Sequence, residues 1–262
     1  MEKIIYGTAW KKERTKDLVV LAIKTGFRAI DTACQPKHYN EPMVGLGIKE
    51  SGIPRPELFI QTKFTSLDGQ DPKNIPYDPN APLEKQVVQS IAISCKNLHT
   101  DYLDSYILHS PMRKYSETLK VWKVMEDYYN DGILKNLGIS NCYDLSYLQA
   151  LYKDVEIKPK FVQNRFYNET NYDKELRKWC DQQNILYQSF WTLTANPNLL
   201  NHPVIIQLAG KYQLTVEQLF FSYVSHMGII PLTGTNNPLH MHLDLEAMNV
   251  ELNGNDIFPF CA

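Results

Sequence analysis

The chain has 262 residues, and its 27 Lys and Arg against 29 Asp and Glu give a formal net charge of -2. This length suits one large domain, and the balanced charge gives no electrostatic reason to expect a nucleic-acid partner. Five widely spaced cysteines without a Cys-x-x-Cys pair argue against a disulfide framework and a zinc site. No apolar run reaches the roughly 20 residues that span a bilayer. We therefore expect a cytoplasmic protein that neither crosses nor binds a membrane.

Short apolar runs alternate with amphipathic stretches along the chain. The runs are rich in Ile, Leu, Val, Phe and Tyr, which is typical of parallel strands covered on both faces. They predict strands over residues 3–7, 28–31, 58–63, 104–108, 134–138, 161–164, 184–188 and 228–231. Helical patterns lie between them over residues 14–25, 82–98, 116–130, 144–153, 171–182, 203–211, 215–226 and, less regularly, 238–247.

Capping residues mark several of these helix boundaries. We expect Thr15 and Asp144 to cap their helices, because such side chains accept hydrogen bonds from the free amide groups of a first turn. Thr215 is followed three residues later by Gln218, which is the spacing of a capping box. Gly26 follows the first helical pattern directly and predicts its end.

Eight strands that alternate with helices predict a (β/α)8 barrel, in a single domain over residues 1–262. The competing fold is an open, doubly wound sheet, which usually has a glycine-rich phosphate loop after an early strand. Here the first strand is followed by Gly7-Thr8-Ala9-Trp10, without a G-x-G-x-x-G pattern. The barrel is therefore favoured. The irregular, proline-rich segment 66–82 is expected to be a loop at the active-site end of the barrel.

Three predicted strands end in an ionisable residue. Asp31, Lys63 and His109 each follow an apolar run, and Tyr39 lies in the polar loop after Asp31. Each residue alone has a structural explanation as a helix cap, a surface lysine, a core histidine or a loop aromatic. Because the carboxyl ends of barrel strands meet at one rim, we expect the four side chains to come together there. An acid, a tyrosine, a lysine and a histidine in one place indicate proton transfer.

An ordered series of motifs resembles the aldo-keto reductase family. The motifs are Gly26–Ala33, Tyr39-Asn40-Glu41, Thr62-Lys63, Asp101–Asp104, Leu108–Pro111, Gly138–Asn141 and Gln163–Phe166. The resemblance covers nearly the whole chain and implies a barrel enzyme that uses NAD(P)H to reduce an aldehyde or ketone to an alcohol. The alternative is a non-catalytic relative that binds a nicotinamide cofactor as a sensor or regulatory subunit.

The chain also departs from the family pattern. Its segment Cys34–His38 is similar to that of a microbial, fungal-like branch of the family. The chain is also shorter than most members at both ends. The family usually has a β-hairpin before the first strand and a long C-terminal tail that walls the substrate site. We therefore expect a more open and less selective pocket.

The resemblance implies that Tyr39 is the general acid that protonates the carbonyl oxygen. An unperturbed tyrosine has a pKa of about 10, so we expect the cation of Lys63 to lower the pKa of Tyr39. Asp31 would hold Lys63 by an ion pair, and His109 would donate a hydrogen bond to the carbonyl oxygen.

The spacing between Asp31 and Tyr39 is longer than the family's usual one. The residues Gln35-Pro36-Lys37 lengthen the intervening loop, but Tyr39 still directly precedes Asn40-Glu41. We therefore assign Tyr39 as the acid, with His38 as the alternative proton donor.

The resemblance implies NADP(H) as the cofactor, with NAD(H) as the alternative. The expected cofactor contacts are Gly7, Thr8, Ser140, Asn141, Gln163, Phe190, Leu193, Thr233, Thr235 and His240. Ser140, Asn141 and Gln163 would hydrogen-bond to the nicotinamide carboxamide, and Phe190 would either stack on the ring or pack in the core. Leu232 stands where NADP-selective members have a lysine for the 2′-phosphate, so weaker NADP(H) selectivity is expected.

Trp10, Ser110 and Trp191 are expected to line a pocket for a small carbonyl substrate, although each tryptophan also suits a core or exterior position. No metal is expected, because the strand ends lack a cluster of histidines and acids. We expect a monomer or a weak dimer.

Overall fold

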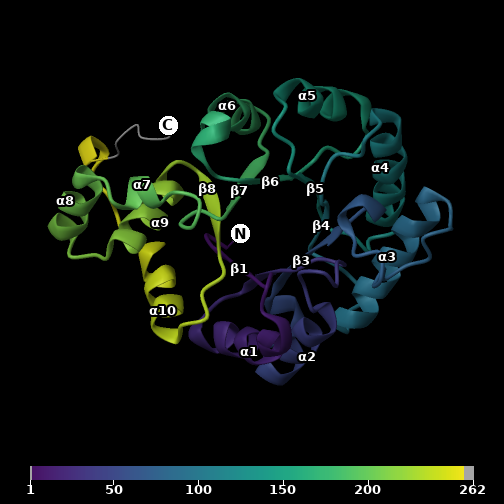
Figure 1. Ribbon diagram of the computed structural model, residues 1–262, viewed down its shortest axis with the longest axis horizontal. Coiled ribbons are helices and arrows are strands. Elements are labelled where there is room, and N and C mark those ends of the chain that lie inside the picture. The colour runs from purple at the N-terminus through teal and green to yellow at the C-terminus, as the bar shows by residue number, and fades with distance from the viewer. Residues whose placement is uncertain (1, 257–262) are drawn as a thin grey trace.

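The computed structural model describes residues 2–256, and the apolar segment 257–262 lies outside the described residues. Eight parallel strands close into a barrel in chain order, with β8 hydrogen-bonded to β1 (Figure 1). The strands are β1 (Ile5–Gly7), β2 (Ala29–Asp31), β3 (Phe59–Phe64), β4 (Ser105–Leu108), β5 (Leu137–Ser140), β6 (Phe161–Arg165), β7 (Leu186–Phe190) and β8 (Ile229–Thr233). The predicted (β/α)8 architecture is confirmed.

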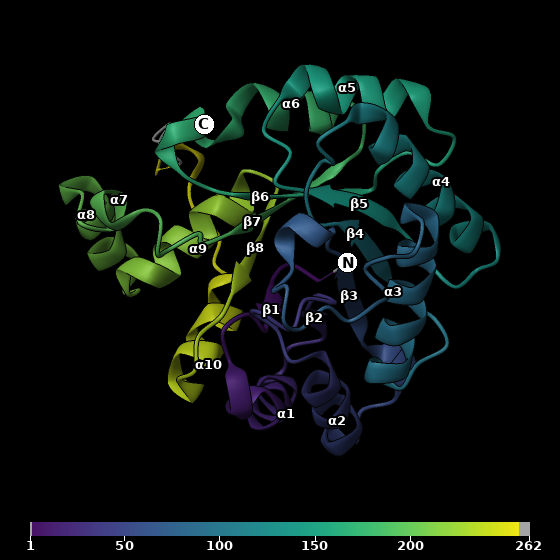
Figure 2. The same ribbon diagram turned by 45° about the vertical axis from the view of Figure 1, so that its right-hand side comes forward.

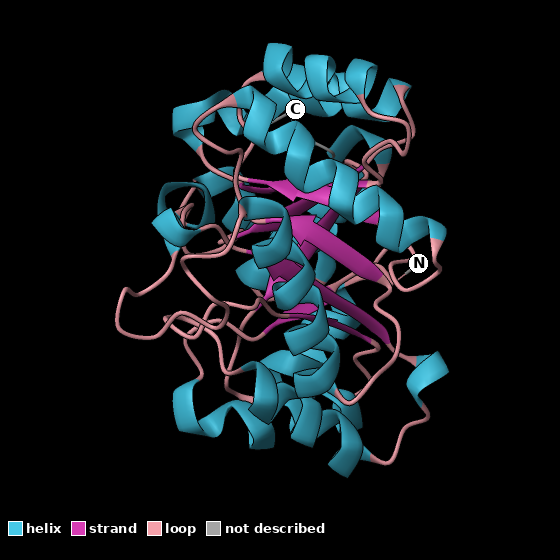
Figure 3. Cartoon of the chain, turned by 90° about the vertical axis from the view of Figure 1, so that its right-hand side faces the viewer, coloured by secondary structure: helices cyan, strands magenta, loops and turns pink. Residues whose placement is uncertain are grey.

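The helices form a ring outside the barrel (Figures 1 and 2). They are α1 (Thr15–Thr25), α2 (Glu41–Ser51), α3 (Leu83–Leu98), α4 (Tyr115–Asn130), α5 (Leu145–Asp154), α6 (Lys174–Gln182), α7 (Pro197–Leu200), α8 (Pro203–Tyr212), α9 (Val216–His226) and α10 (Pro238–Ala247). Helix α10 contacts α1 and so closes the ring. The side view in Figure 3 shows the strands enclosed between helices. Within residues 2–256, no helix has the length and apolarity needed to cross a membrane.

The interior of the barrel is layered because alternate residues of each strand point inward. Ile5, Ala29 and Ile230 are buried together, with Phe59, Leu186 and Leu232 packed against them. Two positions further along their strands, Asp31 follows Ala29, Gln61 follows Phe59 and Gln188 follows Leu186. These three side chains are buried, so a polar layer lies between the apolar layer and the carboxyl ends of the strands.

Several predicted boundaries are shifted in the structure. Strand β5 begins at Leu137, three residues later than expected, because Leu134 instead forms an isolated bridge with Leu103. Strand β7 covers Leu186–Phe190 and is displaced by two residues. Helix α6 begins only at Lys174, because the preceding segment Asn168–Asp173 is a kinked 3-10 turn.

The capping predictions are confirmed at two helices and wrong at one. The Asp144 carboxylate accepts hydrogen bonds from the amides of Ser146 and Tyr147. Thr215 and Gln218 form the expected capping box of α9. Thr15 is the first residue of α1 and not its cap, because a 3-10 turn over Lys12–Arg14 precedes the helix. The Thr15 hydroxyl donates to the Lys12 carbonyl at 2.7 Å.

Helix α2 has no counterpart among the sequence predictions. Its Pro42 and two glycines give a weak helical pattern, yet the Asn40 side chain caps it by accepting from the Met43 amide. Gly45 packs against the end of α3 so closely that a Cβ atom there would overlap the backbone carbonyl of Asn97. This glycine therefore allows α2 to lie close to α3. Helix α2 begins at Glu41, two residues after the predicted general acid Tyr39.

We expect Gly45→Ala to lower the free energy of unfolding by about 1–3 kcal/mol, the usual cost of overpacking. Gly210→Ala in α8 is the matched control, because no atom lies within 4 Å of its Cβ position. That change should raise stability by about 0.5–1 kcal/mol, since alanine suits a helix better than glycine. Urea unfolding curves of both variants measure the difference, and equal stability would contradict the close approach of α2 and α3.

Candidate active site

Asp31 and Lys63 form an ion pair inside the barrel. The Lys63 Nζ lies 2.5 Å from Asp31 Oδ2 and 2.9 Å from the Thr32 carbonyl oxygen. The two residues are 2% and 1% exposed, so neither charge has water to solvate it. Burial lowers the pKa of Lys63, whereas the Asp31 and Glu41 carboxylates oppose that shift. The pair is therefore stable only where its remaining hydrogen-bonding capacity is also satisfied.

Three buried glutamines supply that capacity. The Gln61 and Gln163 amides donate to Asp31 Oδ1 at 2.7 Å and 3.0 Å. Both also donate to the Gln188 side-chain oxygen, and Gln188 donates back to Gln61. In this glutamine layer, defined by Gln61, Gln163 and Gln188, the first two residues hold the carboxylate and Gln188 links them to each other. Gln163, which is predicted to hold the nicotinamide carboxamide, lines the large cavity, and its amide nitrogen donates to Asp31 and Gln188.

The lengthened loop brings Tyr39 beside the ion pair. The amides of His38 and Tyr39 both donate to the Gln35 carbonyl, so the inserted residues form one tight turn. The Gln35 side chain donates to the Gly69 carbonyl at 2.7 Å, which ties this turn to the 66–82 loop. The Lys63 Nζ lies 5.3 Å from the centroid of the Tyr39 ring.

The pKa of Tyr39 shifts in the direction opposite to the one expected. Burial raises the pKa of the phenol, and the Asp31 carboxylate raises it further. The expected lowering by Lys63 is therefore outweighed, and Tyr39 is protonated throughout the neutral range.

His109 faces the same space from the end of β4. Its ring centroid lies 6.1 Å from that of Tyr39, in an edge-on arrangement. Burial lowers the pKa of His109 to about 3, with smaller contributions from Lys63 and His38, so the ring is neutral near pH 7. Its Nδ1 lies 2.6 Å from the Thr65 hydroxyl oxygen. The Thr65 hydroxyl makes no other hydrogen bond within residues 2–256, so it is free to donate to Nδ1, which leaves the ring proton on Nε2.

The alternative donor, His38, lies further out on the loop. Its ring stacks on Trp10 with 4.0 Å between the centroids, and the Trp10 amide donates to the His38 carbonyl at 2.7 Å. Trp10 is 59% exposed, so this stack lies at the outer edge of the site. The Tyr39 ring, in contrast, lies next to Lys63.

A cavity of about 1010 Å³ opens above the ion pair at the carboxyl ends of the strands. It is lined by Asp31, Tyr39 and His109, and Lys63 lies beneath them. It is also lined by the predicted residues Gly7, Trp10, Ser110, Ser140, Asn141, Gln163, Phe190, Trp191, Leu193, Thr233, Thr235 and His240. Thr8 is the exception: it is fully buried, and its hydroxyl donates to the Asp31 carbonyl at 2.9 Å. The structure does not bring Thr8 to the cavity.

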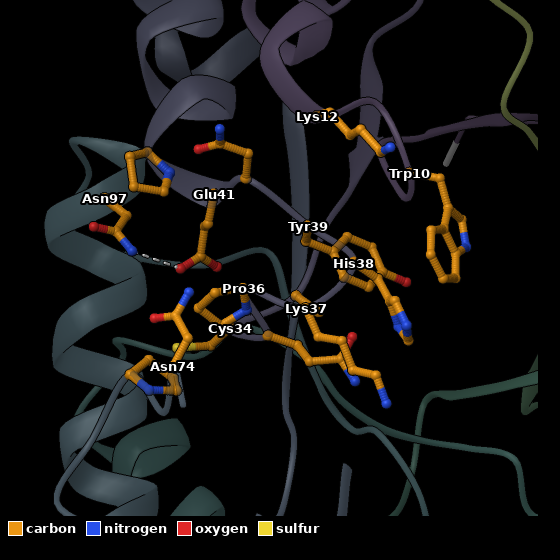
Figure 4. Close-up of a pocket in the computed structure, with 15 residues that line it drawn as sticks. Trp10, Lys12, Cys34, Pro36, Lys37, His38, Tyr39, Glu41, Asn74 and Asn97 are labelled. Carbon is orange, nitrogen blue, oxygen red and sulfur yellow. Dashed lines mark hydrogen bonds between the residues drawn. The ribbon is translucent and has the colours of Figure 1, made fainter. Parts of the chain in front are cut away.

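A smaller cavity of about 360 Å³ lies on the other side of the loop over residues 32–40 (Figure 4). Figure 4 shows the Glu41 side chain directed to Asn97, away from the Tyr39 ring. Glu41 also accepts hydrogen bonds from the hydroxyls of Thr62 and Ser94. Burial raises the pKa of this carboxyl, and its three hydrogen-bond donors oppose the shift. Glu41 therefore anchors the start of α2, two residues after Tyr39.

The aldo/keto reductase family model matches residues 3–202 of the chain. The chain belongs to the aldo-keto reductase family. It is 36% identical over 215 residues to a glyoxal reductase of Bacillus subtilis, covering 82% of this chain and 70% of that protein. It is 31% identical over 244 residues to an NAD/NADP-dependent indole-3-acetaldehyde reductase of Schizosaccharomyces pombe, covering 88% and 79%.

The fold comparison agrees with this assignment. An aldo-keto reductase from a deep-sea metagenome library of the Medee basin superimposes with a TM-score of 0.85 at 25% identity, covering 98% of this chain and 89% of that one. This aldo-keto reductase is accordingly an NAD(P)H-dependent oxidoreductase of carbonyl compounds. The comparisons give no support to the non-catalytic alternative.

Sequence reasoning missed two cations that line the large cavity. Lys11 donates to the Gly234 carbonyl and, at 2.8 Å, to Asn236 Oδ1, so it bridges the loops after β1 and β8. Burial lowers the pKa of Lys11 to about 8. Arg165 is the last residue of β6 and stacks on Trp191. Lys11 directly follows the Gly7–Trp10 segment, and Arg165 lies in the Gln163–Phe166 motif. Their contacts with Asn236 and Trp191 join distant segments, so the sequence motifs do not indicate them.

We expect Thr65→Val to lower kcat by about 10-fold, because His109 Nδ1 loses its donor and the ring is free to adopt the wrong tautomer. Thr65→Ser is the matched control and should restore near-normal turnover, since it keeps the hydroxyl. Steady-state kinetics on one aldehyde measure kcat and KM for each variant. Equal loss in both variants would show that Thr65 acts by packing and not through its hydroxyl.

Proposed function

We propose that this aldo-keto reductase reduces small aldehydes to alcohols, with Tyr39 as the general acid. The observation that carries the proposal is the convergence of Asp31, Lys63, His109 and Tyr39 at one cavity. Two relatives whose names state reduction of glyoxal and of indole-3-acetaldehyde support an aldehyde substrate. We further propose a cytoplasmic protein that is a monomer or a weak dimer.

Each residue has a distinct part in moving or holding a proton. A nicotinamide cofactor, when bound, supplies the hydride. The His109 Nε2–H donates a hydrogen bond to the carbonyl oxygen, which polarises the carbonyl and orients it. Tyr39 gives its phenolic proton to the same oxygen as negative charge develops there. Lys63 then stabilises the phenolate through its nearby charge, and Asp31 keeps the Lys63 amine in position.

The residues around the large cavity suit a nicotinamide dinucleotide. The cavity has a volume of about 1010 Å³ and is bordered by the Phe190 ring and by polar groups of Ser140 and Asn141. Within the described chain, Lys11 is hydrogen-bonded to neutral oxygens and has no carboxylate in an ion pair. An anionic diphosphate is the kind of group that such a buried, unpaired cation attracts. We propose that these residues, with Gly7, Leu193, Thr233 and Thr235, hold the cofactor.

The cavity wall near β8 has few groups that would favour the 2′-phosphate of NADPH over the free ribose of NADH. Leu232 has no charge to pair with a 2′-phosphate, and two carboxylates, Glu217 and Asp244, line the same cavity. Asp244 accepts from the Thr233 hydroxyl at 2.7 Å, and burial raises its pKa to about 6, so it is largely ionised at pH 7. Negative groups repel a phosphate dianion but accept hydrogen bonds from a ribose diol. We therefore propose that both cofactors are used.

Tyr39→Phe should lower kcat by about 100- to 10,000-fold, the usual contribution of a general acid, because phenylalanine has no proton to donate. Cofactor affinity, followed by quenching of intrinsic fluorescence, should be unchanged. Tyr129→Phe on the outer face of α4 is the control and should retain full activity. Undiminished turnover in Tyr39→Phe would remove Tyr39 from the mechanism and leave His38 as the donor to test.

The dissociation constants of NADPH and NADH should differ by less than about 10-fold, since Leu232 replaces the expected cation for the 2′-phosphate and each factor of ten requires about 1.4 kcal/mol. Glu217→Gln should tighten NADPH binding about threefold and leave NADH binding unaltered, because it removes one repulsive charge. Glu175→Gln, exposed on α6, is the matched control. Tight, strongly NADPH-selective binding by the unaltered protein would refute the proposed dual use.

A further inference from the structure

Arg165 occupies an unusual position at the mouth of the barrel. It is the last residue of β6, and the alternation of the strand places it on the same inward face as Phe161 and Gln163. Gln163 belongs to the glutamine layer, so Arg165 lies one layer nearer to the open end. Its side chain is half-buried and lines the large cavity.

Two aromatic rings hold the Arg165 guanidinium in place. Its Cζ lies 4.2 Å from the centroid of the Trp191 ring and 5.2 Å from that of Tyr167. Trp191 has a φ of 55°, a left-handed backbone that is uncommon for a residue with a bulky side chain. A strained backbone of this kind persists only where the surrounding structure holds it. Here the strained residue is the one whose indole ring stacks on the guanidinium. The head group of Arg165 is therefore positioned before any ligand arrives.

The charge of Arg165 has no counter-ion in the described part of the chain. No carboxylate of residues 2–256 lies within 4.0 Å of its nitrogens, and its buried Nε has no hydrogen-bond partner. The acids that line the same cavity are Asp31, Glu217 and Asp244. Asp31 is paired with Lys63, and Asp244 accepts from Thr233. A half-buried cation without an anion is costly unless a ligand provides one.

We propose that Arg165 binds the carboxylate of an acidic carbonyl substrate, such as an oxo acid or a carboxylated aldehyde. The proposal rests on the function proposed above and names the substrate class. A planar guanidinium with free Nη groups matches a carboxylate in a bidentate pair. Lys11, fixed at the loops after β1 and β8, is a separate cation for the cofactor, whereas Arg165 lies on β6, which β7 separates from β8. The substrate, bound between Tyr39 and the mouth, has its carboxylate within the same cavity as Arg165.

A matched pair of aldehydes tests this assignment. 4-Carboxybenzaldehyde and methyl 4-formylbenzoate share a ring and a carbonyl but differ in charge. In Arg165→Met the ratio of kcat/KM for the acid to that for the ester should fall about 10- to 100-fold, mainly through KM, which is the range for hydrogen bonds to charged groups. Arg165→Lys should recover only part of the ratio, because lysine keeps the charge but not the planar fork.

The other outcomes each decide against the proposal. An unchanged ratio means that Arg165 does not contact the substrate carboxylate. An equal loss for both aldehydes, together with weaker NADPH and NADH binding, assigns Arg165 to a cofactor phosphate. Cofactor titration of the variant distinguishes these two results.

A binding measurement separates this proposal from the proposed function. Benzoate should quench the fluorescence of Trp191 saturably in the unaltered protein, and benzamide, its neutral analogue, should not. Arg165→Met should abolish the quenching, and Trp191→Phe should confirm the reporter. If neither aldehyde is reduced but benzoate binds through Arg165, the proposed reaction fails and the anion site stands. If benzoate does not bind, the anion site is refuted.

Discussion

The buried ion pair between Asp31 and Lys63 is the constraint on which the rest of the site depends. Two charges removed from water gain little from each other unless every remaining polar group is satisfied. Here Asp31 Oδ2 accepts from Lys63, and Asp31 Oδ1 accepts from Gln61 and Gln163. The barrel must therefore close tightly enough for side chains of β3 and β6 to reach one carboxylate on β2, and for Gln188 of β7 to bond to both glutamines. Closure of the barrel thus determines where the Lys63 amine lies relative to Tyr39.

Much of the fold could be predicted because its signals are local. Apolar runs separated by amphipathic stretches indicate strands and helices wherever they occur, and the caps at Asp144 and Thr215 are read from neighbouring residues. Helix α2 was missed for the same reason. Its Pro42, Gly45 and Gly47 weaken the local pattern, whereas its stability comes from close packing on α3. Packing between distant segments is not visible in the spacing of residues along one segment.

In the candidate site, residues at strand ends could be predicted from the sequence, but contacts between strands could not. Asp31, Lys63 and His109 were found because each ends a strand, and strand ends converge in a barrel. The glutamine layer, the Thr65 contact with His109 and the stack of Arg165 on Trp191 were not found. Each joins residues from different strands or loops, and glutamine or threonine inside a strand gives no chemical signal by itself. The sequence could not tell whether the longer loop brings Tyr39 beside Lys63. A turn closed by the Gln35 carbonyl does so.

A raised pKa suits the general-acid role that we propose for Tyr39. Burial and Asp31 favour the protonated phenol, whereas the cation of Lys63 near the ring favours the phenolate. Tyr39 therefore keeps its proton until it meets a base stronger than a phenolate. A carbonyl oxygen is a weak base, and it becomes a strong one only as the carbon gains electrons during reduction. Proton transfer is thus tied to reduction. His109 is neutral near pH 7, because burial lowers its pKa to about 3, and in the proposed mechanism the neutral ring donates a hydrogen bond to the carbonyl oxygen from Nε2.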